Sequence, residues 1–282
     1  MSKVAIVTDS TAYIPQEMLK RYPITVLPQV LIWGEETFRD GVDIQPVEFY
    51  TRLAKATVMP STSQVSPVEF ETAFRALNAQ GYEVLAITIA NSLSGTMASA
   101  IQAKTALDGQ PIELVDSNTT AMAMGFQVLA AAKAAVRGAS LAECKAIAEA
   151  AQPRTGVVIT VETLEFLHRG GRIGGAQKFL ATALNIKPII EVVEGKLEGV
   201  EKVRTRRKAL ARLVELVGER TGGKKPLQIS VVHANSREDA ESVLELAKST
   251  YQVTEGSVTD VSPVIGTHVG PGTIGVCWMV EG

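Results

Sequence analysis

The sequence predicts an α/β protein with two α/β domains, over residues 1–153 and 154–282. In the first part, apolar strand-like runs alternate with helical patterns, which is typical of a mostly parallel sheet with flanking helices. After Gln152 and Pro153, a hairpin pattern appears among further strands and helices, which indicates a mixed sheet. The chain has 282 residues, 46% of them hydrophobic, and is therefore long enough to bury two cores.

In the N-terminal part, four apolar runs end in polar residues and are expected to be buried parallel strands: 4–10, 24–33, 84–90 and 112–117. Helical patterns cover 47–55, 68–80, 94–107, 121–136 and 141–151. Ligands of doubly wound sheets bind beyond the carboxyl ends of the strands. Asp9, Ser10, Asn91 and Ser92 fall at that edge.

In the C-terminal part, a glycine-rich segment, HRGGRIGG (168–175), lies between the first predicted strand and the first predicted helix. The predicted strands are 157–161, 227–233, 252–258 and 274–280, and a hairpin turns at 194–196. The predicted helices are 177–184, 205–219 and 237–249.

Composition excludes several classes of function. A net charge of −2 provides no basic face for nucleic acid. The N-terminal segment lacks the pattern of a signal peptide, and no apolar stretch reaches the roughly 18 residues of a membrane span, so a cytoplasmic location is expected. Cys144 and Cys277 match no metal spacing and are expected to be buried, and three histidines cannot supply a His-rich centre. We therefore expect no metal and no cofactor.

Three segments rich in Ser, Thr and Gly adjoin apolar runs: 60–67 (PSTSQVSP), 91–100 (NSLSGTMASA) and 266–275 (GTHVGPGTIG). Each one alone is compatible with an ordinary turn. Together they are typical of the walls of a site, because small hydroxyl residues and glycines let donors approach a ligand closely. None contains Lys or Arg, which favours a carboxylate with an apolar tail over a phosphate.

The chain resembles the DegV family of bacterial fatty-acid-binding proteins. The motifs that carry the resemblance occur in the order of the family and span nearly the whole chain: TDSTAYIP (8–15), FRDGVDI (38–44), STSQVSP (61–67), SLSGTMASA (92–100), LHRGGRI (167–173), LNIKPII (184–190) and GTHVGPGTIG (266–275). The resemblance implies one long-chain fatty acid in a tunnel between the two domains. It also implies a partner, a separate fatty acid kinase that converts the bound acid to an acyl phosphate with ATP, so that this chain is a carrier and not an enzyme.

By the same resemblance, the carboxylate contacts fall on Thr62, Ser94 and His268, beside Gly95 and Thr267. The chemistry agrees, since two hydroxyls and an imidazole can all donate to one carboxylate. Ser94 also precedes Gly95 at an expected helix start, where free N–H groups favour an anion, although a plain helix cap explains it as well. His268 is expected in a glycine-flanked loop before the last strand.

The candidate surroundings of the acyl tail are the small and flexible residues of the 121–136 helix, although a packed core helix explains them equally well. They are Ala121, Met122, Ala123, Met124, Gly125 and Phe126.

Two arginines, Arg169 and Arg172, flank the glycines of HRGGRI. The segment lacks GxGxxG spacing after a strand, so a dinucleotide site is poorly supported. The resemblance implies that both arginines face the kinase, and guanidinium suits phosphate recognition. Solvated charges in a tight turn are the alternative. A basic run at 202–210 is a weaker candidate for transient contact with an anionic membrane.

The main alternative function is a stand-alone serine hydrolase of acyl esters that uses Ser94 or Ser92 with His268 and either Asp9 or Asp116. The SLSGT segment does not match the GxSxG nucleophile elbow, which argues against it. A sensor or scaffold that binds no lipid is the third class, and it leaves the hydroxyl and glycine segments unexplained.

Overall fold

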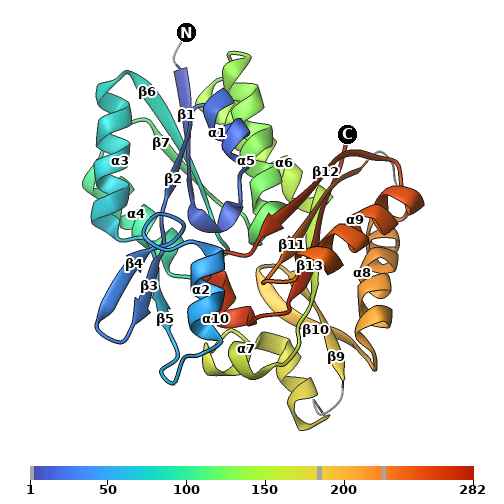
Figure 1. Ribbon diagram of the computed structural model, residues 1–282. Helices are drawn as coiled ribbons and strands as arrows, with labels where there is room; N and C mark the ends of the chain where they lie inside the picture. The colour runs from blue at the N-terminus through green and yellow to red at the C-terminus, as the bar shows by residue number, and fades with distance from the viewer. Residues whose placement is uncertain (1–2, 183–185, 224–226) are drawn as a thin grey trace.

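The structure is a computed structural model that describes residues 3–182, 186–223 and 227–282 (Figure 1). Its N-terminal part contains a four-stranded, fully parallel sheet with strand order β2-β1-β6-β7. The strands are β1 (Lys3–Asp9), β2 (Ile24–Leu27), β6 (Tyr82–Thr88) and β7 (Ile112–Asp116). The predicted parallel sheet is therefore confirmed, with strand bounds that shift by one or two residues at most ends.

The C-terminal part contains a six-stranded mixed sheet with strand order β10-β9-β8-β13-β11-β12. The strands are β8 (Thr155–Thr160), β9 (Lys187–Val193), β10 (Lys196–Val203), β11 (Leu227–His233), β12 (Val253–Asp260) and β13 (Ile274–Val280). Strands β11 and β12 are parallel, and the other neighbours are antiparallel. The predicted hairpin is present and turns at Glu194 and Gly195, whose φ angles of 48° and 78° suit a tight two-residue turn.

The prediction of one strand over 24–33 is wrong. The run divides into β2 and β3 (Val30–Trp33), and β3 pairs with β4 (Glu36–Arg39) and β5 (Ser61–Ser63) in a separate antiparallel sheet. Pro28 stands between the two strands, and proline has no N–H to continue a ladder. This short sheet carries Thr62, one of the expected site residues.

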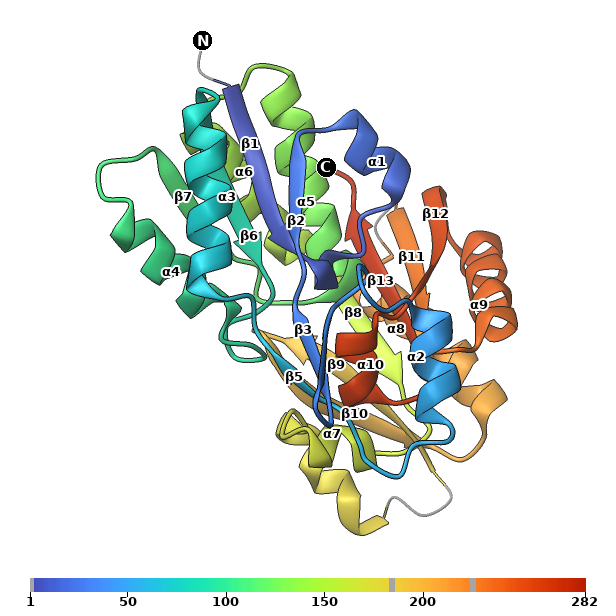
Figure 2. The ribbon, with the colours of Figure 1, turned by 60° about the vertical axis from the view of Figure 1, so that its left-hand side comes forward.

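Helices cover both faces of the four-stranded sheet, and one of them lies between the two large sheets (Figure 2). On one face lie α3 (Pro67–Ala79) and α4 (Thr96–Ala106). On the other, α5 (Ala121–Val136) packs against β1 and also against β8 and β13 of the six-stranded sheet, with α6 (Leu141–Ala151) beside it. Helices α8 (Arg206–Thr221) and α9 (Arg237–Thr250) cover the outer face of the six-stranded sheet.

The central position of α5 explains its composition. Its residues 121–129 are all buried, because the helix contacts a sheet on each side. A Cβ on Gly125 would lie 2.4 Å from the carbonyl oxygen of Ala12, so glycine is required for the close approach of the chain there. Of the six residues expected around an acyl tail, only Ala121 lines the cavity described below. Met122 through Phe126 are buried between the two sheets, which agrees with the alternative of a packed core helix.

Several short helices complete the described chain: α1 (Gln16–Arg21), α2 (Pro46–Leu53), α7 (Glu165–Arg169), α10 (Pro263–Val269) and the 3-10 segments Ser10–Ala12, Gln152–Arg154 and Gly174–Thr182. The helix expected over 177–184 coincides with this last 3-10 segment up to Thr182. The expected positions 183 and 184 lie outside the described residues. The prediction that His268 lies in a loop is wrong, since it falls in the last turn of α10. The domain boundary at 153 stays a prediction, and both cysteines are buried and free as expected.

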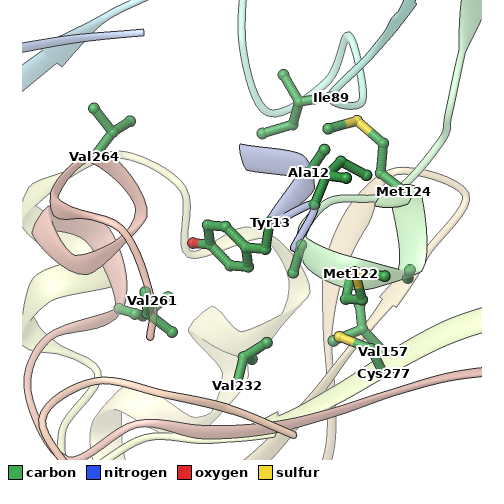
Figure 3. Close-up of a cluster of buried hydrophobic side chains, with 14 of the residues drawn as sticks. Ala12, Tyr13, Ile89, Met122, Met124, Val157, Val232, Val261, Val264 and Cys277 are labelled. Carbon is green, nitrogen blue, oxygen red and sulfur yellow. The ribbon is translucent and has the colours of Figure 1, made fainter. Parts of the chain in front are cut away.

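Helix α10 belongs to the C-terminal part of the chain but packs against α2, β3 and β5. Three N-terminal side chains hold the segment that leads into it. The Tyr13 hydroxyl accepts from Ser262 N at 3.1 Å, and Tyr50 donates to Val261 O at 3.1 Å. Asp40 accepts from Val264 N at 3.1 Å and from the Ser10 hydroxyl at 2.6 Å. Figure 3 shows the Tyr13 hydroxyl directed towards the stretch that carries Val261 and Val264.

Replacing Asp40 should destabilise the protein through this contact. Asp40 is 2% exposed, so Asp40→Ala leaves the N–H of Val264 and a neighbouring hydroxyl without a partner in the interior, at a cost of about 1–3 kcal/mol. Urea unfolding measures the change. Asp43→Ala is the matched control in the same motif, since Asp43 pairs with Arg39 at the surface, and it should cost less. Equal losses in the two variants would contradict the role of Asp40.

Candidate functional site

One cavity is lined by residues from both parts of the chain, and the empty space between them is about 900 Å³ when the solvent at its mouth is included. Polar side chains of the wall include Thr62, Gln64, Ser94, Arg172 and His268. Most of the remaining wall is apolar and includes Ile159, Leu167, Val192, Leu197, Val232 and Val264. The cavity therefore offers both hydrogen-bonding groups and a long apolar surface.

At the polar end, Thr62 of β5 and His268 of α10 form a hydrogen bond, with 2.7 Å between Thr62 Oγ1 and His268 Nε2. The two residues are 206 positions apart, and the docking of α10 beside β5 brings them together. A Cβ on Gly170 would lie only 2.2 Å from His268 Nδ1, so the imidazole ring packs directly on the backbone of this glycine. The first glycine of HRGGRI thus leaves room for the histidine.

His268 is neutral at pH 7. Burial lowers its pKa to about 4, and the positive charge of Arg172 contributes in the same direction. Within the described part of the chain, Nδ1 is buried without a hydrogen-bond partner. An unpaired donor would be the costlier form beside the backbone of Gly170, so we place the ring proton on Nε2, where it is donated to Thr62. The Thr62 hydroxyl hydrogen is then available to a ligand.

Ser94 lies on the same cavity wall, immediately before α4. Its Oγ is 2.9 Å from Thr96 Oγ1, and Gly95 is the N-cap residue of the helix. Gly95 itself packs against the Gln64 side chain, which a Cβ would approach to 3.2 Å. The Thr267 hydroxyl donates to Pro263 O within α10 and lines a separate outer hollow. The structure therefore brings Thr62, Ser94 and His268 to one cavity, whereas Gly95 and Thr267 are not among its lining residues.

Arg172 also lines this cavity, which the sequence analysis did not anticipate. Its Nε donates to Leu93 O at 3.2 Å and one terminal nitrogen donates to Gly170 O at 2.7 Å, so its charge is held beside His268. The expectation of neutral donors alone is therefore incomplete. No local pattern pointed to this position, because the contact with Leu93 spans 79 residues. Arg169 is 56% exposed, pairs with Glu165, and lines the outer hollow, which shares Thr62, Arg172 and His268 with the cavity.

Of the hydrolase candidates, Ser94 and His268 line the same cavity, but neither aspartate lies among its lining residues. A catalytic triad needs an acid at the second nitrogen of the histidine. Asp9 is buried and accepts from Thr11, Gln29 and Ile89 N, and Asp116 accepts from the N–H groups that follow β6 and β7. Both carboxylates are thus used in holding strand ends. The Ser92 hydroxyl donates to Gly195 O, and neither aspartate contacts His268 among the contacts described.

The fold and the cavity define an α/β protein of two large sheets with one largely apolar cavity that has a polar end. The family model described as "Uncharacterised protein, DegV family" matches residues 3–281. The chain therefore belongs to the DegV family. Among curated relatives, it is 34% identical to the DegV domain-containing protein BH3627 of Halalkalibacterium halodurans, over the full length of both chains. It is 35% identical to Protein DegV of Bacillus subtilis, over 98% of each chain.

Solved structures of other proteins share this fold. A DegV family protein from Thermus thermophilus, described by its fatty acid binding, superposes with a TM-score of 0.93 at 32% identity over 99% of this chain and 100% of that one. DegV from Bacillus subtilis, described as a fatty acid binding protein, gives a TM-score of 0.90 at 33% identity over the whole of both chains. A stearic acid-binding protein from Eubacterium ventriosum gives a TM-score of 0.91 at 26% identity over 99% of this chain and 98% of that one.

Among the helices of the described ranges, none has both the length and the apolar character that a membrane span requires.

The low pKa of His268 predicts a specific dependence of stability on pH. An unfolded histidine takes up a proton near pH 6.5, whereas His268 in the folded protein does so near pH 4. The contribution of the neutral ring is therefore fully present above pH 6.5 and is lost as the pH falls towards 4. His268→Gln should lack this loss, so the stabilities of wild type and variant should converge or cross in that window. Urea unfolding across the pH range measures it, and parallel curves would contradict a buried neutral ring.

Proposed function

We propose that the protein binds one long-chain fatty acid, with the carboxylate at Thr62, Ser94 and His268 and the tail along the apolar wall. The single observation that carries the proposal is the Thr62 and His268 pair at the wall of a cavity that is otherwise mostly apolar. The fatty acid binding described for the Thermus thermophilus and Bacillus subtilis proteins supports the choice of ligand. In this proposal, the cavity serves as the tunnel that was expected between the domains.

The polar end suits a carboxylate better than a neutral head group. Thr62 and Ser94 supply hydroxyl donors, and His268 can turn its Nε2 proton from Thr62 to the ligand. The guanidinium of Arg172 offsets the cost of moving a negative charge out of water. The tail then supplies most of the affinity, since burial contributes about 0.8 kcal/mol per CH₂ group.

We further propose that the bound acid is presented to a separate fatty acid kinase. The chain contains no GxxxxGK[ST] loop that would hold ATP by itself. Arg169 and Arg172 border the outer hollow, which adjoins the carboxylate end, so both are suited to guide a phosphoryl group to the acid. In this arrangement the chain acts as a carrier, located in the cytoplasm, and needs neither a cofactor nor a metal.

A transient membrane contact through 202–210 is retained as a lesser proposal. Arg206 in this run is already paired with Glu162 and Asp239, whereas the neighbouring Arg204 and Arg207 form no ion pair in the described structure. These two cations give a weak attraction to anionic lipid.

Loss of a carboxylate donor should weaken binding. A hydrogen bond to a charged group is typically worth about 1.5–3 kcal/mol, so Thr62→Ala or Ser94→Ala should raise the dissociation constant for palmitic acid roughly ten- to a hundredfold. Denaturation of the purified wild type should also release a free fatty acid, which mass spectrometry detects. Thr105→Ala, which removes an exposed hydroxyl on α4, is the control and should bind normally. Unchanged affinity in both site variants would refute the assignment.

Arg169→Ala should distinguish fatty acid binding from phosphoryl transfer to the bound acid. The side chain is exposed and paired only with Glu165 among the contacts described, so the variant should retain bound lipid. With a fatty acid kinase and ATP, acyl phosphate formation should fall strongly. Arg75→Ala on α3 is matched, because Arg75 forms the same kind of ion pair with Glu71 at similar exposure, and it should leave product formation intact. Loss of lipid from Arg169→Ala, or normal product formation, would remove Arg169 from the partner surface.

A further inference from the structure

The cavity is closed on one side by the end of the β9–β10 hairpin. Val192 and Leu197 lie opposite each other in the hairpin register, and both line the cavity. The pairing of β9 with β8 ends at Glu191, which lies opposite Val158. The segment 192–197 therefore extends beyond the support of the rest of the sheet, and it is a short two-stranded ribbon, which is weak when isolated.

The tip of this ribbon rests on the N-terminal part of the chain. The Ser92 hydroxyl donates to the carbonyl oxygen of Gly195. Gly195 is buried, and a Cβ there would lie 2.7 Å from Ser92 Oγ and 3.1 Å from the Cβ of Ala90. Glycine is needed both for this close seat and for its φ of 78°. The contact thus joins the hairpin to the strand ends of the four-stranded sheet, next to Leu93 and Ser94 of the cavity wall.

We propose that the hairpin end, residues 192–197, is the gate through which the acyl chain enters and leaves, and that the hydrogen bond from Ser92 to Gly195 is its latch. The inference rests on the proposed fatty acid binding. A long acyl chain cannot pass a packed wall without displacing it. Breaking this hydrogen bond, withdrawing Gly195 and parting Leu197 from Gly174 of the neighbouring 3-10 segment release Val192 and Leu197 together. Opening at β5 or at α10 would instead break the pairing of β3 with β5 or the docking of α10.

A latch has a kinetic signature that a ligand contact lacks. Ser92→Ala removes the hydrogen bond, so association and dissociation of palmitic acid should both become about three- to tenfold faster, with an equilibrium constant that changes less than twofold. Ser257→Ala is the matched control, because it removes a serine hydroxyl bonded to Ser230 at the far edge of the six-stranded sheet. Unchanged rates in Ser92→Ala, or a weaker affinity with an unchanged association rate, would overturn the latch.

A reversible cross-link tests the gate directly. The double variant Ser92→Cys and Gly195→Cys places a disulfide across this contact, since a Cβ at position 195 would lie 2.7 Å from the side-chain oxygen of Ser92, and the native cysteines are buried. Because a side chain at position 195 disturbs the close seat, the reduced form of the same variant is the reference for the oxidised form. Protein loaded with isotope-labelled palmitic acid is oxidised with glutathione disulfide, and exchange against unlabelled acid is followed by mass spectrometry. Exchange should slow at least about tenfold on oxidation and recover on reduction. Equal exchange in the two redox forms would overturn the gate. A wild type that binds no fatty acid would overturn the proposed function itself.

Discussion

The docking of the segment before α10 is the interaction on which the rest of the site depends. Asp40 is almost fully buried, and burial raises its pKa, so its hydrogen bonds to Val264 N and Ser10 are needed to offset the cost of placing a carboxyl group in the interior. Tyr13 and Tyr50 add two further bonds to the same segment. Together they fix the start of a helix of only seven residues, whose last turn carries His268. This anchor fixes where α10 begins and therefore helps to place the imidazole beside Thr62 and on Gly170.

The position of α5 sets the second constraint. Since it packs against both large sheets, its side chains are small or flexible and leave little free space. The cavity therefore lies beyond the strand ends of the four-stranded sheet, where α10, the β9–β10 hairpin and the short β3–β5 sheet meet. Only the start of α5 reaches it, through Thr120 and Ala121. Ala121 has a φ of 55°, an unusual conformation for a residue with a Cβ, which turns the chain from β7 into the helix.

Regular elements were predictable from the sequence because their periodicity is local. The runs that became β1, β6, β7, β11 and β13 are continuous apolar segments, and the capping boxes at Ser66 and Ser140 mark their helices clearly. The division at Pro28 was also marked by a proline, and Ser262 before Pro263 is a typical helix start. Both signals were outweighed by a longer pattern, an apolar run in one case and a glycine-rich run in the other.

The composition of the site was less predictable, because side chains distant in sequence assemble it. Family motifs pointed to Thr62, Ser94 and His268, and the structure places these three residues on one cavity. That Arg172 shares the wall, and that Gly170 makes room for the ring of His268, follows only from the way α7 and α10 pack together. The sequence left two interpretations of α5 open, because a helix rich in Ala and Met suits a lipid tunnel and a tight interface between sheets equally well.

The pairing of Thr62 with His268 affects how much the carboxylate and the acyl tail of a fatty acid each contribute to the binding free energy. In the structure described, His268 already donates its Nε2 proton to Thr62, so a carboxylate that takes this proton must replace an existing hydrogen bond, whereas the Thr62 hydroxyl hydrogen is free to donate. The net gain from His268 is therefore modest, as it is for most exchanged hydrogen bonds, and the hydroxyl donors contribute more. An uncharged head group would gain still less, because it lacks the attraction to Arg172. On the proposed function, the polar end therefore decides which class of compound binds, while the apolar wall, closed by Val192 and Leu197, decides how tightly it is held.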